Sequence, residues 1–457
     1  MSRLPIGVAS IIWSLVAFGF AVQFFLEKAY IALGVEILIV VAIAVLSRSA
    51  GGRTFLNRMK LPVLAIVSAF IVGGIVLILS DLEFYTKFGL DPIGTLASSL
   101  GRVAEAYGAL IVGALGDPGK ISTALASGNA NKIGIALRPI SETFLATTPL
   151  ILAGLGVAVA FRSGVFNIGA EGQLKIGAMF AVWVGIWVPL PGPFHVLLAL
   201  AAGILGGALW GFIPGILKAR TGAHEVITTI MLNAIAQQVM LALLLSPVLQ
   251  PPGGTTPISM PIEASAQLPL LLDLPKLRVH LGLVIALLAA AWTSWLMFRT
   301  TKGFEFRAAG LNPRAAGYAG MHAGRTIVLA MVVSGGLAGL AGASEVLGTT
   351  HYLSPTISPG YGWDAISLAL LGGTRPGGVV VAALLFGALR AGGPGMALAT
   401  GVPIDLLAFI SALVIMFVAA PRLVREIYRV KLTATAPSTP RPQERSEERR
   451  VGKECRL

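Results

Sequence analysis

Long apolar runs separated by short polar loops dominate the sequence. Runs of about 17–24 residues are long enough to cross a bilayer as helices. They predict membrane-spanning helices over 6–26, 29–47, 61–80, 143–161, 174–190, 194–217, 225–247, 280–298, 326–347, 377–390 and 404–420. Two shorter apolar pieces, 104–115 and 364–372, are typical of half-helices or re-entrant segments. The pattern predicts an all-α polytopic membrane protein with about 10–12 transmembrane segments.

The stretch 162–173, between two of these runs, is too polar and too rich in glycine for a membrane helix. It carries Asn167, Glu171 and Gln173 among several glycines. A glycine lowers helix stability by about 1 kcal/mol, and a charge at the bilayer centre costs at least ~2.5 kcal/mol. Non-helical backbone at membrane depth survives where protein buries it or where it lines a wet cavity. We therefore expect a broken, cavity-lining segment, with an ordinary loop at the membrane surface as the alternative.

A matching interruption follows the apolar run 326–347. The stretch 351–362 is rich in proline, serine and glycine, and the short piece 364–372 then re-enters the membrane. The run before the first interruption leads inward and the run before the second leads outward, which predicts an inverted repeat. Interrupted segments at matching places in two halves predict a transport site between them.

Composition and charge agree with a membrane location. Of the 457 residues, 55% are hydrophobic and 12% are charged, whereas a soluble domain has about 25% charged residues. The net charge of +13 would suggest a nucleic-acid partner in a soluble protein. Here lysine and arginine gather in 48–60, in 299–325 and after the last apolar run. This bias predicts that these segments and both termini are cytoplasmic and that 248–279 is outside, so no nucleic-acid partner is needed.

No motif for nucleotide hydrolysis or other catalysis is found. The Gly-Lys pairs at 119–120 and 452–453 are followed by Ile121 and Glu454, so neither completes a phosphate-binding loop. The single cysteine, Cys455, allows neither an intrachain disulfide nor a cysteine metal site. We expect no enzyme activity and no cofactor in this chain, so that ATP and Mg²⁺ would be bound by a partner ATPase.

Several blocks, in order along the chain, carry a family resemblance. They are Gly-Val-Phe-Asn-Ile-Gly-Ala-Glu-Gly-Gln at 164–173 and the blocks at 217–233, 301–313 and 401–403. Over about residues 61–425 the chain resembles permease subunits of ABC importers for nucleosides and simple sugars, in the branched-chain amino acid and ribose permease superfamily. The resemblance implies ABC ATPase subunits, a second permease subunit in a homo- or heterodimer, and an extracytoplasmic substrate-binding lipoprotein of the basic-membrane-protein type. It also implies the bilayer of a bacterial cytoplasmic membrane.

The resemblance defines the expected domain organisation. Residues 1–60 fall outside it and are expected to add two helices and a basic loop. Residues 61–431 are expected to form the permease transmembrane domain. The polar, proline-containing stretch 432–457 is expected to be a disordered cytoplasmic tail.

The cytoplasmic loop 299–325 is the expected meeting point with the ATPase. In the family a short cytoplasmic helix sits in a groove of the ATPase, and Asn312-Pro313 is a natural start for such a helix. A plain positive-inside loop is the alternative. The residues expected to carry ATPase coupling are Glu305, Arg307, Asn312, Ala315, Ala316 and Gly320.

Five residues at the two interruptions are expected to line the substrate pathway. Asn167, Glu171 and Gln173 offer hydrogen-bonding groups to ribose hydroxyls or base edges, but could equally satisfy the broken backbone. Trp363 and Asp364 form the corresponding pair in the second half. Trp363 could stack on a base or belong to the interfacial aromatic belt.

The function that follows is import of a nucleoside or a related simple sugar by alternating access, driven by ATPase subunits in other chains. One rival is an ion-coupled secondary transporter with Glu171 or Asp364 as its proton site. The other rival is an intramembrane enzyme. The choice between nucleoside and sugar stays open, because both are small polyols reached by hydrogen bonds.

Overall fold

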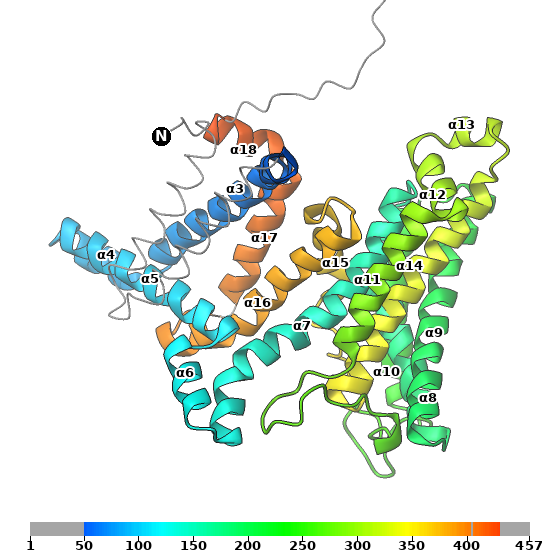
Figure 1. Cartoon of the computed structure of the whole chain (residues 1–457), viewed down its shortest axis with the longest axis horizontal. Helices are drawn as coiled ribbons and strands as arrows, with labels where there is room; N and C mark the ends of the chain where they lie inside the picture. Colours follow the sequence, from blue (N-terminus) through cyan, green and yellow to red (C-terminus); the bar gives the residue numbers. More distant parts are fainter. Residues whose placement is uncertain (1–49, 404, 430–457) are drawn as a thin grey trace, which may run out of the picture.

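A computed structural model describes residues 50–403 and 405–429, and its regular elements are helices (Figure 1). The predicted spans 6–26 and 29–47 and the predicted tail 432–457 lie outside the described residues. The helices are α3 (Ala50–Leu79), α4 (Leu82–Phe88), α5 (Pro92–Leu115), α6 (Pro118–Ala126), α7 (Ala130–Arg162), α8 (Ala170–Trp187), α9 (Gly192–Thr221), α10 (Glu225–Leu244), α11 (Gly282–Arg299), α12 (Thr301–Leu311), α13 (Pro313–Tyr318), α14 (Ala323–Glu345), α15 (Tyr361–Leu371), α16 (Pro376–Thr400), α17 (Asp405–Ala419) and α18 (Pro421–Tyr428).

Within the described part of the chain, six helices are long and apolar enough to cross a membrane: α7, α9, α10, α11, α14 with the turn that follows it, and α16. The pair α3 and α4, bent by 68° at their junction, adds a seventh if it is one span. The predicted spans 174–190 and 404–420 correspond to α8 and α17. The all-α, multi-pass class predicted from the apolar runs is therefore confirmed.

The stretch 104–115, predicted as a half-helix or a re-entrant segment, is not a separate half-helix. These residues are the last part of the 24-residue helix α5. The helix starts earlier because the Asp91 side chain accepts a hydrogen bond from the Gly94 N–H (3.0 Å) and Pro92 occupies the first turn. Its first half carries Thr95 and Ser98, which lower the hydropathy of the segment but do not interrupt the helix.

The core is built where helix backbones approach closely around α14. A Cβ atom added to Gly177 of α8 would lie 2.3 Å from the Gly339 Cα atom, and one added to Gly207 of α9 would lie 2.2 Å from the Gly335 carbonyl oxygen. Small residues let membrane helices pack through their backbones, where van der Waals contact replaces the hydrophobic effect as the driving force. This packing holds α8 and α9 against α14.

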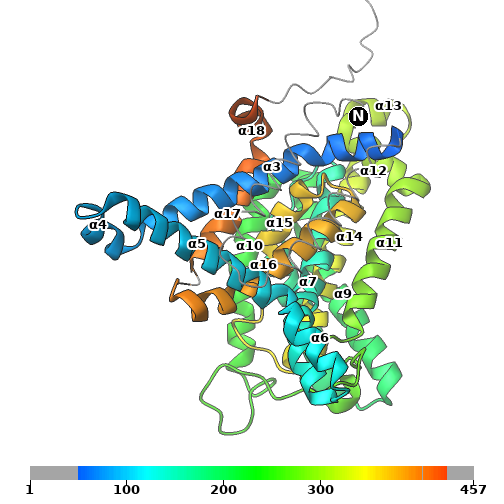
Figure 2. The same ribbon diagram turned by 60° about the vertical axis from the view of Figure 1, so that its left-hand side comes forward.

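The two ends of the molecule carry different loops. Helices α12, α13 and α18 and the start of α3 lie at one end, and the connection between α10 and α11 lies at the opposite end (Figures 1 and 2). The described residues of the segments that the lysine and arginine bias assigns to one side of the membrane therefore share one end. Which end faces the cytoplasm stays a prediction.

Labelling of single cysteines tests this orientation. In a Cys455→Ser background, we expect Thr255→Cys to react with a membrane-impermeant maleimide in intact cells. Tyr318→Cys, at a position 94% exposed, should react only after permeabilisation. Reaction at position 318 from outside would reverse the topology.

Candidate transport site at two broken helices

The first break lies between α7, which ends at Arg162, and α8, which begins at Ala170. The Asn167 side chain folds back into it. Its Oδ1 accepts hydrogen bonds from the Gly169 N–H (3.0 Å) and the Gln173 side-chain amide (3.1 Å), and its Nδ2 donates to Gln173 Oε1 (2.8 Å) and Ser334 Oγ (2.7 Å). Asn167 thus joins the break to α8 and to α14.

The break is shorter than the predicted 162–173. Glu171 and Gln173 belong to the first turns of α8, so only 163–169 are non-helical. The helix begins early because Asn233 of α10 substitutes for a local cap. Its Oδ1 accepts from the Gly172 N–H (2.8 Å), and its Nδ2 donates to the Ile168 carbonyl (2.9 Å).

The three polar residues predicted at this break are buried. The exposed fractions of Asn167, Glu171 and Gln173 are 0%, 4% and 1%. Protein therefore encloses these three polar side chains, whereas Phe166 in the same break is 55% exposed. That these three residues contact the substrate stays a prediction.

The second break begins where α14 gives way to a π-helical turn, Val346–Thr350. His351 follows with a φ of 62°, and the chain stays non-helical until Gly360, whose φ is 94°. The connection between α10 and α11 is hydrogen-bonded to this turn. The Leu268 N–H donates to the Leu347 carbonyl (2.8 Å), and the Ile262 N–H donates to the His351 carbonyl (2.9 Å). π-Turns of this kind are rare and are often found at functional sites.

The two breaks meet at the Glu171 carboxylate. Its Oε2 accepts hydrogen bonds from the Ser358 hydroxyl (2.8 Å) and from the Gly362 N–H (2.9 Å) in the first turn of α15. Its Oε1 lies 3.0 Å from Lys175 Nζ. A carboxylate at the N-terminal ends of two helices is favoured by both helix dipoles. Glu171 therefore fixes the start of α15 against the start of α8.

Glycine is required at this junction. A Cβ atom at Gly362 would lie 2.2 Å from the Glu171 backbone nitrogen. The two helix starts thus touch through their backbones. The prediction of two interruptions is confirmed, and the structure brings them into direct contact.

The remaining predicted pathway residues lie on the more open side of α15. The Trp363 side chain is 47% exposed. Asp364 Oδ2 accepts from Arg390 Nε (3.1 Å) and Nη2 (2.6 Å). Arg390 of α16 also donates to the Pro359 carbonyl (3.0 Å) and lies 4.9 Å from the Tyr361 ring centroid. This arginine ties the second break to α16.

Sequence reasoning missed the partners that hold the breaks together. The signal for Lys175 was its spacing of four residues from Glu171, which places both on one helix face. The signal for Arg390 was a lone charge beside an otherwise apolar run. Ser334, Asn233 and Ser358 gave no signal, because only the tertiary fold brings them to the breaks.

Both predicted pathway carboxylates have a basic partner. Glu171 pairs with Lys175 and Asp364 pairs with Arg390. Within the described residues, no group of three or more histidine, cysteine, aspartate or glutamate side chains could hold a metal ion. Of the five predicted pathway residues, Trp363 has the most exposed side chain, whereas Asn167 and Gln173 are buried and hydrogen-bonded to each other.

The short helix predicted after Asn312-Pro313 is confirmed as α13, and its cytoplasmic location stays a prediction. The Asn312 side chain accepts from the backbone N–H groups of Arg314 and Ala315, both at 3.1 Å. Glu305 pairs with Lys302 at 2.9 Å, and Gly320, with a φ of 80°, turns the chain toward α14.

Not every predicted coupling residue faces outward. Ala316 is buried at 3% exposure, and the half-buried Arg307 lies over the Phe298 ring. The outward side chains that were missed are Leu311 and Tyr318, which are 89% and 94% exposed. Their signal was two large apolar residues flanking a short polar helix.

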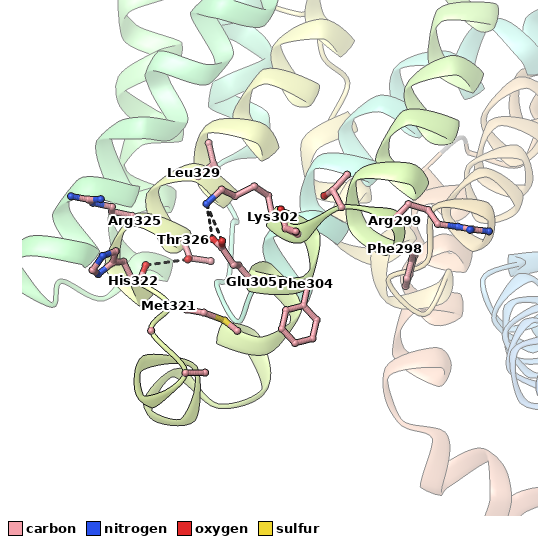
Figure 3. Close-up of a pocket in the computed structure, with 14 residues that line it drawn as sticks. Phe298, Arg299, Lys302, Phe304, Glu305, Met321, His322, Arg325, Thr326 and Leu329 are labelled. Carbon is pink, nitrogen blue, oxygen red and sulfur yellow. Dashed lines mark hydrogen bonds and ion pairs between the residues drawn. The ribbon is translucent and has the colours of Figure 1, made fainter.

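A hollow of about 630 Å³ lies beside these helices. Figure 3 shows Lys302 and Glu305 paired on one side of it, with His322, Arg325 and Thr326 from the start of α14 opposite. It opens at the end of the molecule that carries α13. It is therefore a feature of the predicted cytoplasmic face and is separate from the two breaks.

Comparison with known proteins agrees with this architecture. The guanosine ABC transporter permease protein NupP of Bacillus subtilis is 46% identical over 63% of this chain and 82% of its own length. The nucleoside ABC transporter permease protein NupB of Lactococcus lactis is 35% identical over 79% of this chain and 91% of its own. The glucose ABC transporter permease protein TsgB13 of Haloferax volcanii is 33% identical over 78% and 86%. No solved structure was found to match the chain.

A family match covers the part of the chain that contains both breaks and helices α12 and α13. Residues 140–419 match the family described as branched-chain amino acid transport system / permease component. This range is more than half of the sequence, and it begins and ends within the described helices α7 and α17. The chain is therefore a member of this permease family and an ABC importer permease.

Proposed function

We propose that this permease moves a nucleoside, or a related simple sugar, into the cytoplasm by alternating access around the two breaks. The observation that carries the proposal is the contact between the two breaks at Glu171, where helices α8 and α15 begin next to each other. Helices that begin within the membrane provide a site at which each half can move relative to the other. The relatives whose printed names are guanosine and nucleoside permeases support the substrate class.

The charge balance at the breaks supports a neutral substrate. Glu171 and Asp364 each have a basic partner, so the predicted pathway residues carry no unpaired charge. Trp363 is the predicted pathway residue best placed to touch a ligand, since its ring is half exposed while Asn167 and Gln173 are enclosed. Stacking of a base on an aromatic ring is worth about 1–3 kcal/mol.

ATP hydrolysis belongs to partner ATPase subunits in this proposal, because the sequence has no phosphate-binding loop. Helix α13 and the exposed Leu311 and Tyr318 are the proposed contact with those subunits. An extracytoplasmic binding lipoprotein would deliver the substrate, and a second permease subunit would complete the pathway. We place both termini in the cytoplasm of a bacterial cell, in agreement with the lysine and arginine bias.

Uptake by the assembled transporter tests the function. We expect radiolabelled nucleoside to accumulate in proteoliposomes that contain ATP, permease, ATPase and binding lipoprotein, with competing pentoses and hexoses deciding between nucleoside and sugar. Accumulation that follows an imposed proton gradient and ignores ATP would favour the secondary transporter instead. Chemical conversion of substrate by the permease alone would favour the enzyme.

Trp363→Ala should lower nucleoside uptake by about tenfold, the effect of losing one base-stacking contact. Trp363→Phe should keep most of it. The matched control is Trp295→Ala, because Trp295 is a comparably exposed tryptophan, at 56%, on the membrane helix α11. Equal losses at both positions would assign Trp363 to the aromatic belt and remove it from the pathway.

A further inference from the structure

Arg162, the last residue of α7, joins the first break to the turn that follows the second. Its Nε donates a 2.6 Å hydrogen bond to the Thr374 carbonyl. Thr374 lies between α15 and α16 and has a φ of 54°, which is unusual for a residue other than glycine. The end of α7 and the end of the re-entrant helix α15 are therefore joined on the side of the molecule away from the connection between α10 and α11.

Phe298, near the end of α11, brings the cytoplasmic helices into the same contact. The Arg162 guanidinium carbon lies 5.0 Å from its ring centroid, and the Arg307 guanidinium carbon lies 5.4 Å from it. Arg307 belongs to α12. Within the described part of the chain no acidic side chain pairs with either arginine. Both guanidinium groups lie over this one ring, and Arg307 Nε also donates to the Gly303 carbonyl (3.3 Å) in its own helix.

A backbone contact reinforces this arrangement. A Cβ atom added to Gly310 of α12 would lie 2.1 Å from the Arg162 carbonyl oxygen, and one added to Gly164 would lie 2.9 Å from the Gly310 Cα atom. The last turn of α12 is therefore seated on the first break with no side chain between them. A shift of α12 toward the break has no free space to absorb it.

We propose that Arg162, Phe298 and Arg307, with the contact between Gly164 and Gly310, form a joint that transmits movement of α12 and α13 to both broken segments. These are positioning residues, which act through the breaks and do not touch substrate. The inference rests on the proposed function for its direction: the cytoplasmic helices receive the movement from the ATPase, and the breaks carry the substrate.

The contacts of Arg162 explain how the joint can act on both breaks. Arg162 connects three elements at once: the first break by covalent continuity, the α15–α16 turn by its hydrogen bond, and α11 with α12 through Phe298. At their other side the two breaks are held together at Glu171. Both breaks thus move as a unit with α12 as long as the joint is intact.

Variants of the joint should uncouple ATP hydrolysis from uptake. In the full transporter, Phe298→Leu and Arg162→Lys are expected to lower substrate molecules moved per ATP by about tenfold. Phe298→Tyr keeps a ring face and should retain the ratio. The basal ATPase rate and the recovery of the assembled complex should stay unchanged in all of them.

Arg299→Lys is the matched control for Arg162→Lys. Arg299 is exposed at the end of α11, next to Phe298, and its side chain extends away from the paired Lys302 and Glu305 (Figure 3). No hydrogen bond or ion pair of its side chain is found among the described residues. A loss at Arg299→Lys equal to that at Arg162→Lys would overturn the proposal.

A distance measurement tests the joint without reference to any substrate. Spin labels at Thr301→Cys in α12 and Gly377→Cys in α16, in a Cys455→Ser background, report the separation of two elements that the joint connects. A side chain at position 377 meets no atom within 4 Å. We expect one narrow distance distribution, unchanged by ATP, in the otherwise unmodified transporter, and a broad one in Phe298→Leu.

The two proposals fail in different ways. If the distances behave as expected but neither nucleoside nor sugar is taken up, the proposed function is wrong and the joint stands. If uptake is normal in Phe298→Leu and its distance distribution stays narrow, the joint is wrong and the proposed function stands.

Discussion

Glu171→Ala is expected to lower the free energy of unfolding by about 3–5 kcal/mol, the cost of leaving one member of a buried ion pair without its partner. Lys175 and Glu171 have side-chain exposures of only 11% and 5%, so solvent cannot replace the missing carboxylate. The substitution also leaves the Ser358 hydroxyl and the Gly362 N–H without their acceptor. The start of α15 should separate from α8, and uptake should be lost with it.

A set of three variants separates charge from hydrogen bonding. Glu171→Gln retains an oxygen acceptor for the Gly362 N–H and leaves only Lys175 unpaired, so its loss of stability should be smaller. Glu171→Gln combined with Lys175→Met removes both charges and should recover most of the stability, because an uncharged replacement of a buried pair is often tolerated. Thermal unfolding in nanodiscs measures all three.

The opposite order of stabilities would contradict this account. If the double variant unfolds at a lower temperature than Glu171→Ala, the ion pair is not what makes the single change costly. Hydrogen exchange at Gly362 and its neighbours would show which end of α15 has loosened.

Sequence alone could predict the two breaks because their composition conflicts with the surrounding apolar runs. Glycine and amide side chains beside Glu171 exclude an ordinary membrane helix, and proline with serine does the same in the second half. Asn312-Pro313 likewise marks the start of α13 by a local cap that needs no tertiary contact. Features that depend only on residues close in sequence could therefore be predicted.

The limits of the first break could not be predicted, because a residue 61 positions away sets them. Asn233 caps Gly172 from α10 and so lets α8 include Glu171 and Gln173. The enclosure of Asn167 has the same origin, since Ser334 of α14 completes its hydrogen bonds. Polar residues that tertiary partners satisfy and polar residues that face a substrate look alike in a sequence.

Helix α5 shows a different limit of hydropathy. Its first half is too polar for a membrane run, but a helix needs only an N-terminal cap and residues that tolerate its backbone. Asp91 supplies the cap. Apolar runs therefore locate the lipid-facing length of a segment better than they locate the ends of its helix.

The close approach of α9 to α14 leads to the second large effect. Gly339→Leu is expected to prevent stable folding, and Gly339→Ala to lower stability by about 1–3 kcal/mol, since overpacking forces the backbone to shift. A Cβ atom at position 339 would lie 2.3 Å from the Gly203 carbonyl oxygen and 2.8 Å from the Gly207 Cα atom. Both neighbours are backbone atoms, so no side chain can turn aside.

Gly108→Ala is the matched control, because a Cβ atom at that position of α5 meets no atom within 4 Å. It should leave the unfolding temperature unchanged or raise it slightly, as an alanine in a helix favours folding by up to about 1 kcal/mol over glycine. Gly339→Ala should also lower uptake in the folded fraction, since α14 carries the Ser334 hydroxyl that receives a hydrogen bond from Asn167. Equal unfolding temperatures for the two alanine variants would mean that α9 can move away from α14 at little cost, and the backbone contact would then not define the core.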